Sequence, residues 1–418
     1  MRKHKRLGAS FVMAGAVAVV SVATALPASA DAQPQPGDVV GVGSDTLQYT
    51  GFLWDGDPQG DPGFNAGQRN RVFSFYATGD DNGRAVFDGT CGAAGSNGLG
   101  TACAATTNQT PNSLAGTVVL RAGTLPVARP NGSGSGVGAL IANSTGGSGY
   151  HGLPANQINF ARMSRLPNTT EETTCDGITA CGGLHVVQLG TDLLSIAVSK
   201  TTATNAPASL TAAQLVHIYQ CDSGYQKWND TGVGGTATST IHPLIPQTGS
   251  GTRNFFLADL KAANNGTDIT LGACVRTVQE HDPTGIFGDP SPADAIEPFS
   301  SARLHLLNTP IGSGATYFGN SGASSGAAPG FAPNTLTTLT GTGTYSSSRG
   351  IYIAFRKADE SSTKAFEPGS SLNFVKTLFL GSNSWVARAS NKALIESAGF
   401  TAAYADCGID PTSPTACQ

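Results

Sequence analysis

Short apolar runs typical of β-strands alternate along this chain with stretches that can form amphipathic helices, and this alternation narrows the choice of fold more than any other property. The strand-like runs cover residues 38–42, 157–161, 184–189, 194–198, 241–246 and 350–355. The helix candidates cover residues 209–219, 253–262, 371–380 and 391–397, with Ser209 or Thr211 as N-cap of the first. Strands that alternate with helices predict an α/β fold with largely parallel sheets.

The length of the chain indicates more than one folding unit. It has 418 residues, which exceeds one ordinary domain and predicts two lobes. Residues 56–116 and 310–348 are rich in glycine and other small residues. We expect both stretches to form long surface loops or insertions rather than linkers between independent domains.

The N-terminus has the three-part pattern of a secretory signal peptide. Residues 2–6 carry four lysines and arginines, residues 7–26 are apolar, and Ala28-Ser29-Ala30 offers a small-residue cleavage site. An uncleaved membrane anchor is the alternative, but the polar residues after Ala30 favour cleavage there. No cysteine stands at the cleavage site, so no lipid anchor is expected. The sequence therefore predicts an exported protein, secreted or periplasmic.

The charge of the chain argues against two classes of partner. The net charge at pH 7 is −4, and the signal peptide holds four basic residues and no acidic one, so residues 31–418 carry −8. An acidic chain with few charges is a poor candidate for binding nucleic acid or anionic lipid. A small anion is still a possible ligand, because a local cage of N–H dipoles outweighs distant, screened charges.

The eight cysteines predict disulfide bonds, because their number is even and the chain is exported. Pairing the closest neighbours leaves one distant pair, which we expect to tie separate elements together. The predicted bonds are Cys91–Cys103, Cys175–Cys181, Cys407–Cys417 and the distant pair Cys221–Cys274. A zinc site is the alternative, but no Cys-x-x-Cys or His-x-x-x-His spacing supports it. We expect no metal and no cofactor.

Three short loops rich in Gly, Ser and Thr each precede an apolar stretch that can begin a helix or strand. They cover residues 43–47, 132–137 and 249–256. A loop of this kind at a helix start presents backbone N–H groups and small hydroxyls, and the helix dipole adds partial positive charge. Glycine also lets the backbone approach a ligand closely. Three such loops at one point would form an anion cage.

The order of these loops along the chain resembles one protein family. Residues 42–47, 131–136, 158–167, 192–198, 210–219, 228–230 and 247–253 are similar in order to substrate-binding proteins of phosphate ABC transporters. The resemblance spans roughly residues 39–400, and the Gly-Ser-Gly-Thr of residues 249–252 is its firmest match. It implies the type 2 periplasmic-binding-protein fold, in which two α/β lobes with mixed sheets are joined by two crossing hinge strands. The lobes close over an oxyanion in the cleft between them.

The resemblance also implies lobe boundaries and site residues. We expect a signal peptide at 1–30, lobe 1 at 31–189 with 345–405, lobe 2 at 190–344, and a disulfide-held tail at 406–418. The implied ligand-binding residues are those on the matching loops, with the choice between the two serines of the second loop left open: Ser44, Asp45, Thr46, Leu47, Ser133 or Ser135, Ser164, Ser250, Gly251, Thr252 and Arg253.

Two positions depart from the family pattern. Ser164 stands where the family has an aspartate that accepts a proton from hydrogen phosphate, and Pro246 stands where it has an arginine. Asp45 is a candidate replacement for the carboxylate, with helix capping as its alternative role. The candidate replacements for the guanidinium, with surface ion pairs as their alternative, are Arg253, Arg165 and Arg162.

Function follows from these patterns as an expectation. We expect a monomeric, non-enzymatic protein that binds inorganic phosphate or another oxyanion, with an ABC-transporter permease as its partner. The alternative is a secreted protein that keeps the fold as a sensor or surface interaction module. A hydrolase comes last, because the second and third loops have glycine, not serine, at the middle position where a nucleophile elbow needs its serine. Glu280-His281-Asp282 lacks a second histidine at helical spacing and precedes Pro283, so it predicts a turn rather than a metal site.

Overall fold

The computed structural model describes residues 34–48, 50–57, 60–77, 87–88, 110–111, 117–125, 127–308, 310–311, 315–316, 335–411 and 417. The predicted signal peptide, the predicted Cys91–Cys103 bond and much of the two glycine-rich stretches lie outside the described residues. Among the described residues, no helix combines the length and the apolar character needed to cross a membrane.

One mixed sheet organises the molecule. Its strands follow the order β10-β9-β11-β8-β15-β7-β1-β2, and β14 and β16 also pair with β8. The strands are β1 Val39–Gly43, β2 Val72–Ser74, β7 Phe160–Met163, β8 Leu184–Ser199, β9 His242–Pro246, β10 Arg276–Val278, β11 Ala295–Ser300, β14 Leu336–Thr338, β15 Ser346–Arg356 and β16 Thr401–Ile409. The two flanks of the sheet are parallel, whereas every pairing of β8 and β15 is antiparallel.

Three two-stranded pairs lie apart from this sheet. They are β3 Phe87–Asp88 with β4 Thr110–Pro111, β5 Thr117–Val118 with β6 Val127–Ala128, and β12 Pro310–Ile311 with β13 Ala315–Thr316. All three pairs fall within or next to the two predicted insertions.

The described helices are α1 Phe52–Asp55, α2 Ser133–Ala142, α3 Thr169–Asp176, α4 Ala212–Gln220, α5 Gly251–Ala263, α6 Thr284–Phe287, α7 Ser301–Asn308, α9 Phe374–Leu378 and α10 Lys392–Ser397, with 3₁₀ turns η2 Pro292–Asp294, η4 Lys357–Ser361, η5 Trp385–Ala387 and η6 Ala389–Asn391. Helices α3, α4, α5 and α9 begin at a side chain that caps the first turn, whereas α2, α6 and α10 begin without one. Thr211, not Ser209, caps α4, and its hydroxyl accepts the Gln214 N–H at 3.2 Å. The helix predicted at 371–380 is shorter than expected.

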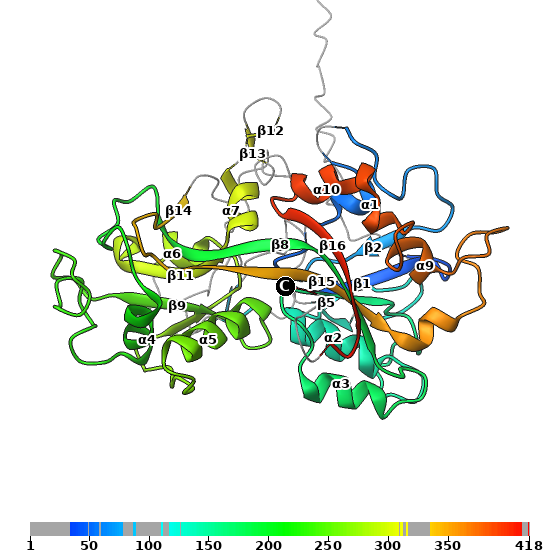
Figure 1. Ribbon diagram of the computed structural model, residues 1–418, viewed down its shortest axis with the longest axis horizontal. Helices are drawn as coiled ribbons and strands as arrows, with labels where there is room; N and C mark the ends of the chain where they lie inside the picture. The colour runs from blue at the N-terminus through cyan, green and yellow to red at the C-terminus, as the bar shows by residue number, and fades with distance from the viewer. Residues whose placement is uncertain are drawn as a thin grey trace, which may run out of the picture.

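Two long strands connect two groups of elements (Figure 1). β8 has 16 residues and β15 has 11, and they pair along their shared length. Strands β9, β10 and β11 with helices α4 and α5 lie at one end, and β1, β2 and β7 with α2 and α3 lie at the other. The sequence predicted two separate strands at 184–189 and 194–198. They form one strand, because Gly190, Thr191 and Asp192 continue the ladder with β15.

A third strand, β16, runs beside β8 where the two expected crossing strands meet (Figure 1). It extends to Ile409, beyond the expected start of the tail at residue 406. The bond between Cys407 and Cys417 joins the tail to this strand.

Buried apolar side chains fill both ends of the molecule. Tyr219, Trp228 and Phe256 belong to a cluster under α4 and α5, and a second cluster packs α2 against β7. The third cluster includes Phe160 from one end and Phe299 from the other. Apolar packing therefore continues past the crossing strands on one face of the sheet.

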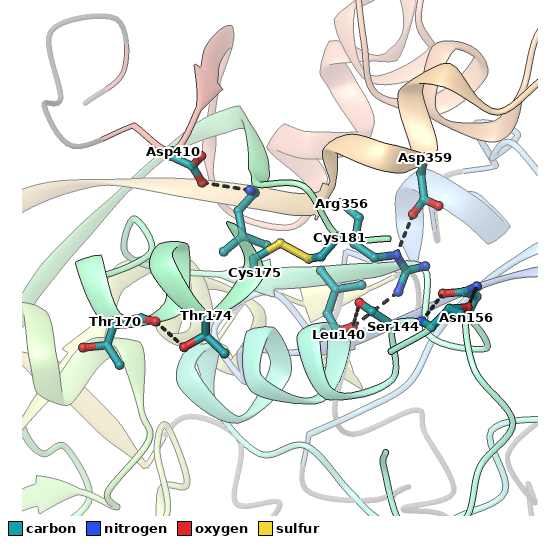
Figure 2. The surroundings of a disulfide bond; sticks show 12 residues. Leu140, Ser144, Asn156, Thr170, Thr174, Cys175, Cys181, Arg356, Asp359 and Asp410 are labelled. Carbon is teal, nitrogen blue, oxygen red and sulfur yellow. Dashed lines mark hydrogen bonds and ion pairs between the residues drawn. A yellow bond between two sulfur atoms is a disulfide. The ribbon is translucent and has the colours of Figure 1, made fainter. Parts of the chain in front are cut away.

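The disulfide predictions are confirmed wherever the structure describes the cysteines. Cys175–Cys181, Cys221–Cys274 and Cys407–Cys417 are bonded. Cys221–Cys274 spans 53 positions of sequence and joins the end of α4 to the segment before β10, as expected of the distant pair. Figure 2 shows the Cys175–Cys181 bond near Arg356, whose guanidinium donates to Asp359 and to the Leu140 carbonyl oxygen.

Candidate functional site

The three Gly/Ser/Thr loops converge in the structure. The Gly134 N–H donates to the Gly249 carbonyl oxygen at 3.1 Å, which joins the second loop to the third. A Cβ on Gly136 would overlap Gly43 of the first loop, and a Cβ on Gly251 would overlap the Ser133 hydroxyl. These contacts explain the glycines, because any side chain there would push the loops apart.

Serine hydroxyls join the first loop to the second. The Ser164 hydroxyl lies 3.3 Å from the hydroxyls of Ser44 and Ser133, and the Ser164 N–H donates to the Ser133 hydroxyl at 3.0 Å. All three serines are buried, whereas Ser135 is exposed. Ser133 is therefore the serine that faces the cluster, and Ser164 binds the loops together at the position where the family has an acid.

Two threonines from the first and third loops form the centre of the site. The hydroxyl oxygens of Thr46 and Thr252 lie 3.3 Å apart, and both residues are buried. Ser250 caps α5 by accepting the Arg253 N–H at 3.0 Å, which places Thr252 in the first turn of this 13-residue helix. Leu47 belongs to the apolar core instead.

The cation of the site is Arg349 on β15, which the sequence did not predict. Its guanidinium donates to Thr252 Oγ1 at 2.7 Å and to Thr46 Oγ1 at 3.3 Å. It also forms a buried ion pair with Asp192 at 2.8 Å. Arg349 and Asp192 are direct cross-strand partners on β15 and β8, so the pairing of the crossing strands positions the cation.

The three arginines proposed from the sequence make other contacts. Arg253 donates to the Pro246 carbonyl oxygen at 2.9 Å, and Arg165 pairs with Glu171 at 2.6 Å. Arg162 donates to two carbonyl oxygens of the first loop, and burial lowers its pKa to about 9. None of these hydrogen bonds is to Thr46 or Thr252, so Arg349 is the guanidinium that contacts the two threonines, and the replacement of the missing arginine by one of the three stays a prediction.

Glu280 and His281 reach the same two threonines from the segment after β10. Glu280 Oε1 accepts the Thr46 hydroxyl at 3.2 Å and the Thr252 N–H at 3.3 Å. The His281 Nε2 atom lies 3.1 Å from each threonine hydroxyl. The segment does turn, as predicted, with a φ of 54° at His281. The sequence did not predict that the turn reaches the loops. We call the group Thr46, Thr252, Glu280, His281 and Arg349 the threonine cage.

The histidine of the cage is a hydrogen-bond donor. The Ser300 N–H donates to His281 Nδ1 at 3.3 Å, so that nitrogen carries no hydrogen. In the neutral ring the hydrogen is then on Nε2, which faces the threonine hydroxyls. Neutral His281 cannot accept a proton from either threonine, because its one basic nitrogen is bound to the backbone.

Asp45 lies beside the cage rather than at a helix cap. It is buried, and its carboxylate is 3.6 Å from Arg303 on α7. The pKa of Glu280 is raised, first by burial and next by the negative charge of Asp45. Hydrogen bonding to Thr252 and the charge of Arg349 oppose this rise.

Amide side chains hold the two ends of the molecule together next to the cage. Asn131, just before the second loop, donates to Gln279 at 2.8 Å and accepts from Gln247 at 3.0 Å. Gln247 in turn accepts the Glu280 N–H at 2.7 Å. The loops and the Glu280 backbone thus share one hydrogen-bonded network. Among the described residues, no group of three or more His, Cys, Asp or Glu side chains is arranged to hold a metal ion.

Comparison with known proteins places this arrangement in a family. The PBP superfamily domain matches residues 89–367. The chain belongs to the PBP superfamily. This membership agrees with the mixed sheet and the two lobes joined by crossing strands. No curated protein sequence matches the chain.

Solved structures to which the chain is similar include a phosphate transport receptor and a phosphate-binding protein, both of low sequence identity. One is an ABC-type phosphate transport receptor from Vibrio cholerae, 14% identical, with a TM-score of 0.44 over 88% of this chain and 100% of the other. Another is a high affinity periplasmic phosphate-binding protein (PfluDING) bound with phosphate, 15% identical, with a TM-score of 0.45 over 87% of this chain and 90% of the other.

Proposed function

We propose that this protein is an exported solute-binding protein that captures phosphate or a related oxyanion in the cleft between its lobes. The observation that carries the proposal is the threonine cage. Two hydroxyls, a helix start and a guanidinium meet there at one buried point. Hydroxyls, backbone N–H groups and arginine are the donors that suit a tetrahedral oxyanion.

Helix α5 supports an anionic ligand most directly. Its first turn contains Gly251 and Thr252, next to the buried Ser250 cap. The N-terminus of a helix carries partial positive charge and unsatisfied N–H groups, so it favours an anion without a full cationic charge. Helix α2 also begins at the cluster, with Ser133 as its first residue.

The proposed capture step is a hinge closure. Lobe 1, residues 31–189 with 345–405, supplies Thr46, and lobe 2, residues 190–344, supplies Thr252 and Glu280. Movement about β8 and β15 would bring these groups around the ligand and remove water from it, which strengthens each polar contact.

The cellular role follows from the proposed export. A signal peptide cleaved after Ala30 would deliver a monomeric binding protein to the periplasm or the medium. Its partner would be the permease of an ABC transporter. The sensor or surface-module alternative is favoured by Ser164 and Pro246, which lack the family's carboxylate and guanidinium. A hydrolase is disfavoured because His281 is a donor toward the threonines.

Calorimetric titration of the oxidised mature protein with phosphate and with sulfate tests the proposal, after unfolding and refolding to remove bound solute. Thr252→Val removes the central hydroxyl at nearly constant volume. Thr248→Val is the matched control, since Thr248 is an exposed threonine directly before the same loop. We expect micromolar or tighter phosphate binding, weakened about tenfold to a hundredfold in Thr252→Val alone, because a hydrogen bond to a charged ligand contributes about 1.5–3 kcal/mol.

Binding of neither anion by wild-type protein at about pH 5.5 or about pH 8 would refute capture of an oxyanion. If Thr248→Val and Thr252→Val change the affinity for phosphate equally, the ligand does not bind at the threonine cage.

A further inference from the structure

Glu280 occupies the part of the cage that suits an anion best. One of its carboxyl oxygens accepts the Thr252 N–H in the first turn of α5, at 3.3 Å, and the Thr46 hydroxyl at 3.2 Å. These donors are the same groups that an external oxyanion would need. The protein's own carboxyl group therefore stands at the helix N-terminus where the proposed ligand would bind.

The other carboxyl oxygen of Glu280 is unsatisfied. Glu280 is fully buried, and its Oε2 atom has no hydrogen-bond partner within the described part of the chain. The backbone of the residue is fixed, because its N–H donates to Gln247. Buried polar atoms are nearly always paired, so an unpaired carboxyl oxygen inside a cluster of donors needs an explanation, which a proton on the carboxyl group or contact with a ligand would supply.

The charges that face Glu280 are mixed in sign. Negative groups come from the first loop and β11, and positive or ionisable groups come from β15 and from its own segment. They are Asp45, Glu297, Arg349 and His281. Arg349 is already paired with Asp192, and Arg303 is the neighbour of Asp45. Burial and the charge of Asp45 raise the pKa of Glu280 and so favour its protonated form, against hydrogen bonds to Thr252 and Ser250 and the charge of Arg349.

We propose that Glu280 is an internal ligand of the threonine cage, and that an external oxyanion binds only as Glu280 takes up a proton from the solvent. The inference rests on the proposed function and deepens it. Proton uptake forms one O–H bond on the carboxylate and breaks none in the ligand. Neutral Glu280 then no longer repels the anion, and its hydroxyl can donate to an oxygen of that anion.

The pH dependence of binding has a definite sign. Binding of the anion is favoured where Glu280 is protonated and weakens as the pH rises above its pKa in the free protein. The dissociation constant should increase about tenfold for each pH unit in that range, because one proton is taken up per anion bound. Capture of phosphate would thus be strongest in acidic surroundings.

Calorimetry in buffers that differ in ionisation enthalpy measures this proton directly. Phosphate is titrated at about pH 8, where it is chiefly the dianion, and sulfate serves as an anion that carries no proton. Three proteins are compared: wild type, Glu280→Gln and Glu297→Gln. Glutamine at position 280 keeps an oxygen that accepts from Thr46 and Thr252. Glu297 is a neighbouring buried acid that makes none of these contacts, so its variant is the matched control.

We expect uptake of about one proton per anion by wild type and by Glu297→Gln, and none by Glu280→Gln, which should bind at least about tenfold more tightly at this pH. Binding by Glu280→Gln at about pH 8, where wild type binds neither anion, would also support the inference if wild type binds phosphate at about pH 5.5. Binding without proton uptake in wild type, or unchanged uptake in Glu280→Gln, would overturn the inference and leave the proposed function intact. If neither protein binds either anion, both proposals fail.

Discussion

Replacement of Arg349 should lower both the free energy of unfolding and the affinity for phosphate, and a second substitution should restore part of the first but not the second. Arg349 makes two hydrogen bonds to Asp192 and one each to Thr46 and Thr252, all in the buried interior. In Arg349→Met the Asp192 carboxylate keeps only two donors, the Ser300 hydroxyl and the Ala302 N–H. Breaking a buried ion pair by removing one partner costs about 3–5 kcal/mol, because the remaining charge is uncompensated. We expect a loss of that size in the free energy of unfolding.

A second substitution identifies the cause of this loss. Asp192→Asn removes the stranded charge and keeps an oxygen that accepts from Ser300 and Ala302. The double variant, Arg349→Met with Asp192→Asn, should therefore regain about 2 kcal/mol or more relative to Arg349→Met. It should still bind phosphate about tenfold to a hundredfold more weakly than wild type, because the guanidinium donors are gone.

Urea unfolding and calorimetric titration of all four proteins measure both effects. An Arg349→Met variant as stable as wild type would show that the ion pair with Asp192 contributes nothing to the free energy of unfolding. A double variant that binds phosphate like wild type would remove Arg349 from the site. The first result would refute the expected role of Arg349 in stability, and the second would refute its role as the cation of the site.

Two further substitutions test the packing and the buried charge of the site. Gly251→Ala should cost about 1–3 kcal/mol in the free energy of unfolding measured in urea, because its Cβ would overlap two serine hydroxyls. Gly138→Ala on α2, where a Cβ meets nothing within 4 Å, should instead stabilise by up to about 1 kcal/mol, and equal effects would contradict the argument. Burial raises the pKa of Glu297, so the folded state binds more protons than the unfolded one above an ordinary glutamate pKa, and stability falls as the pH rises. Glu297→Gln should flatten this fall in urea unfolding at several pH values, and an unchanged pH profile would refute it.

Local patterns predicted the parts of the fold that depend on neighbouring residues. In the third loop Ser250 caps helix α5, and Gly251 leaves room for the neighbouring serine hydroxyls. The prediction that residues 249–256 form a loop followed by a helix is therefore confirmed. The cysteine pairs followed from spacing. The strand at 350–355 was found too, although its first four residues, 346–349, were not. These signals arise within a few residues of the chain, and a single sequence displays them.

The charged residues of the cage could not be predicted in the same way. Arg349 reaches the threonines because β15 pairs with β8 in a register that sets it opposite Asp192, which lies 157 positions earlier. Nothing local to Ser348 or Gly350 indicates that register. Glu280 likewise reaches Thr46 across 234 positions of sequence. The family resemblance directed attention to Ser164 and Pro246, where the expected charges are absent, but it offered no sign of where replacements lay.

The new position of the cation changes what it can contribute. A guanidinium held by Asp192 from the adjacent strand presents hydrogen-bond donors to the threonines but no net positive charge, since the ion pair is neutral as a whole. The attraction for a dianion must then come from the helix terminus, from the donors and from the neutral state of Glu280. Because the arginine adds no net charge to the cage, uptake of a proton by Glu280 would offset part of the charge of the bound anion. The ion pair on the crossing strands would then supply hydrogen-bond donors, and the protonation of Glu280 would supply the charge compensation that an anion needs inside an acidic protein.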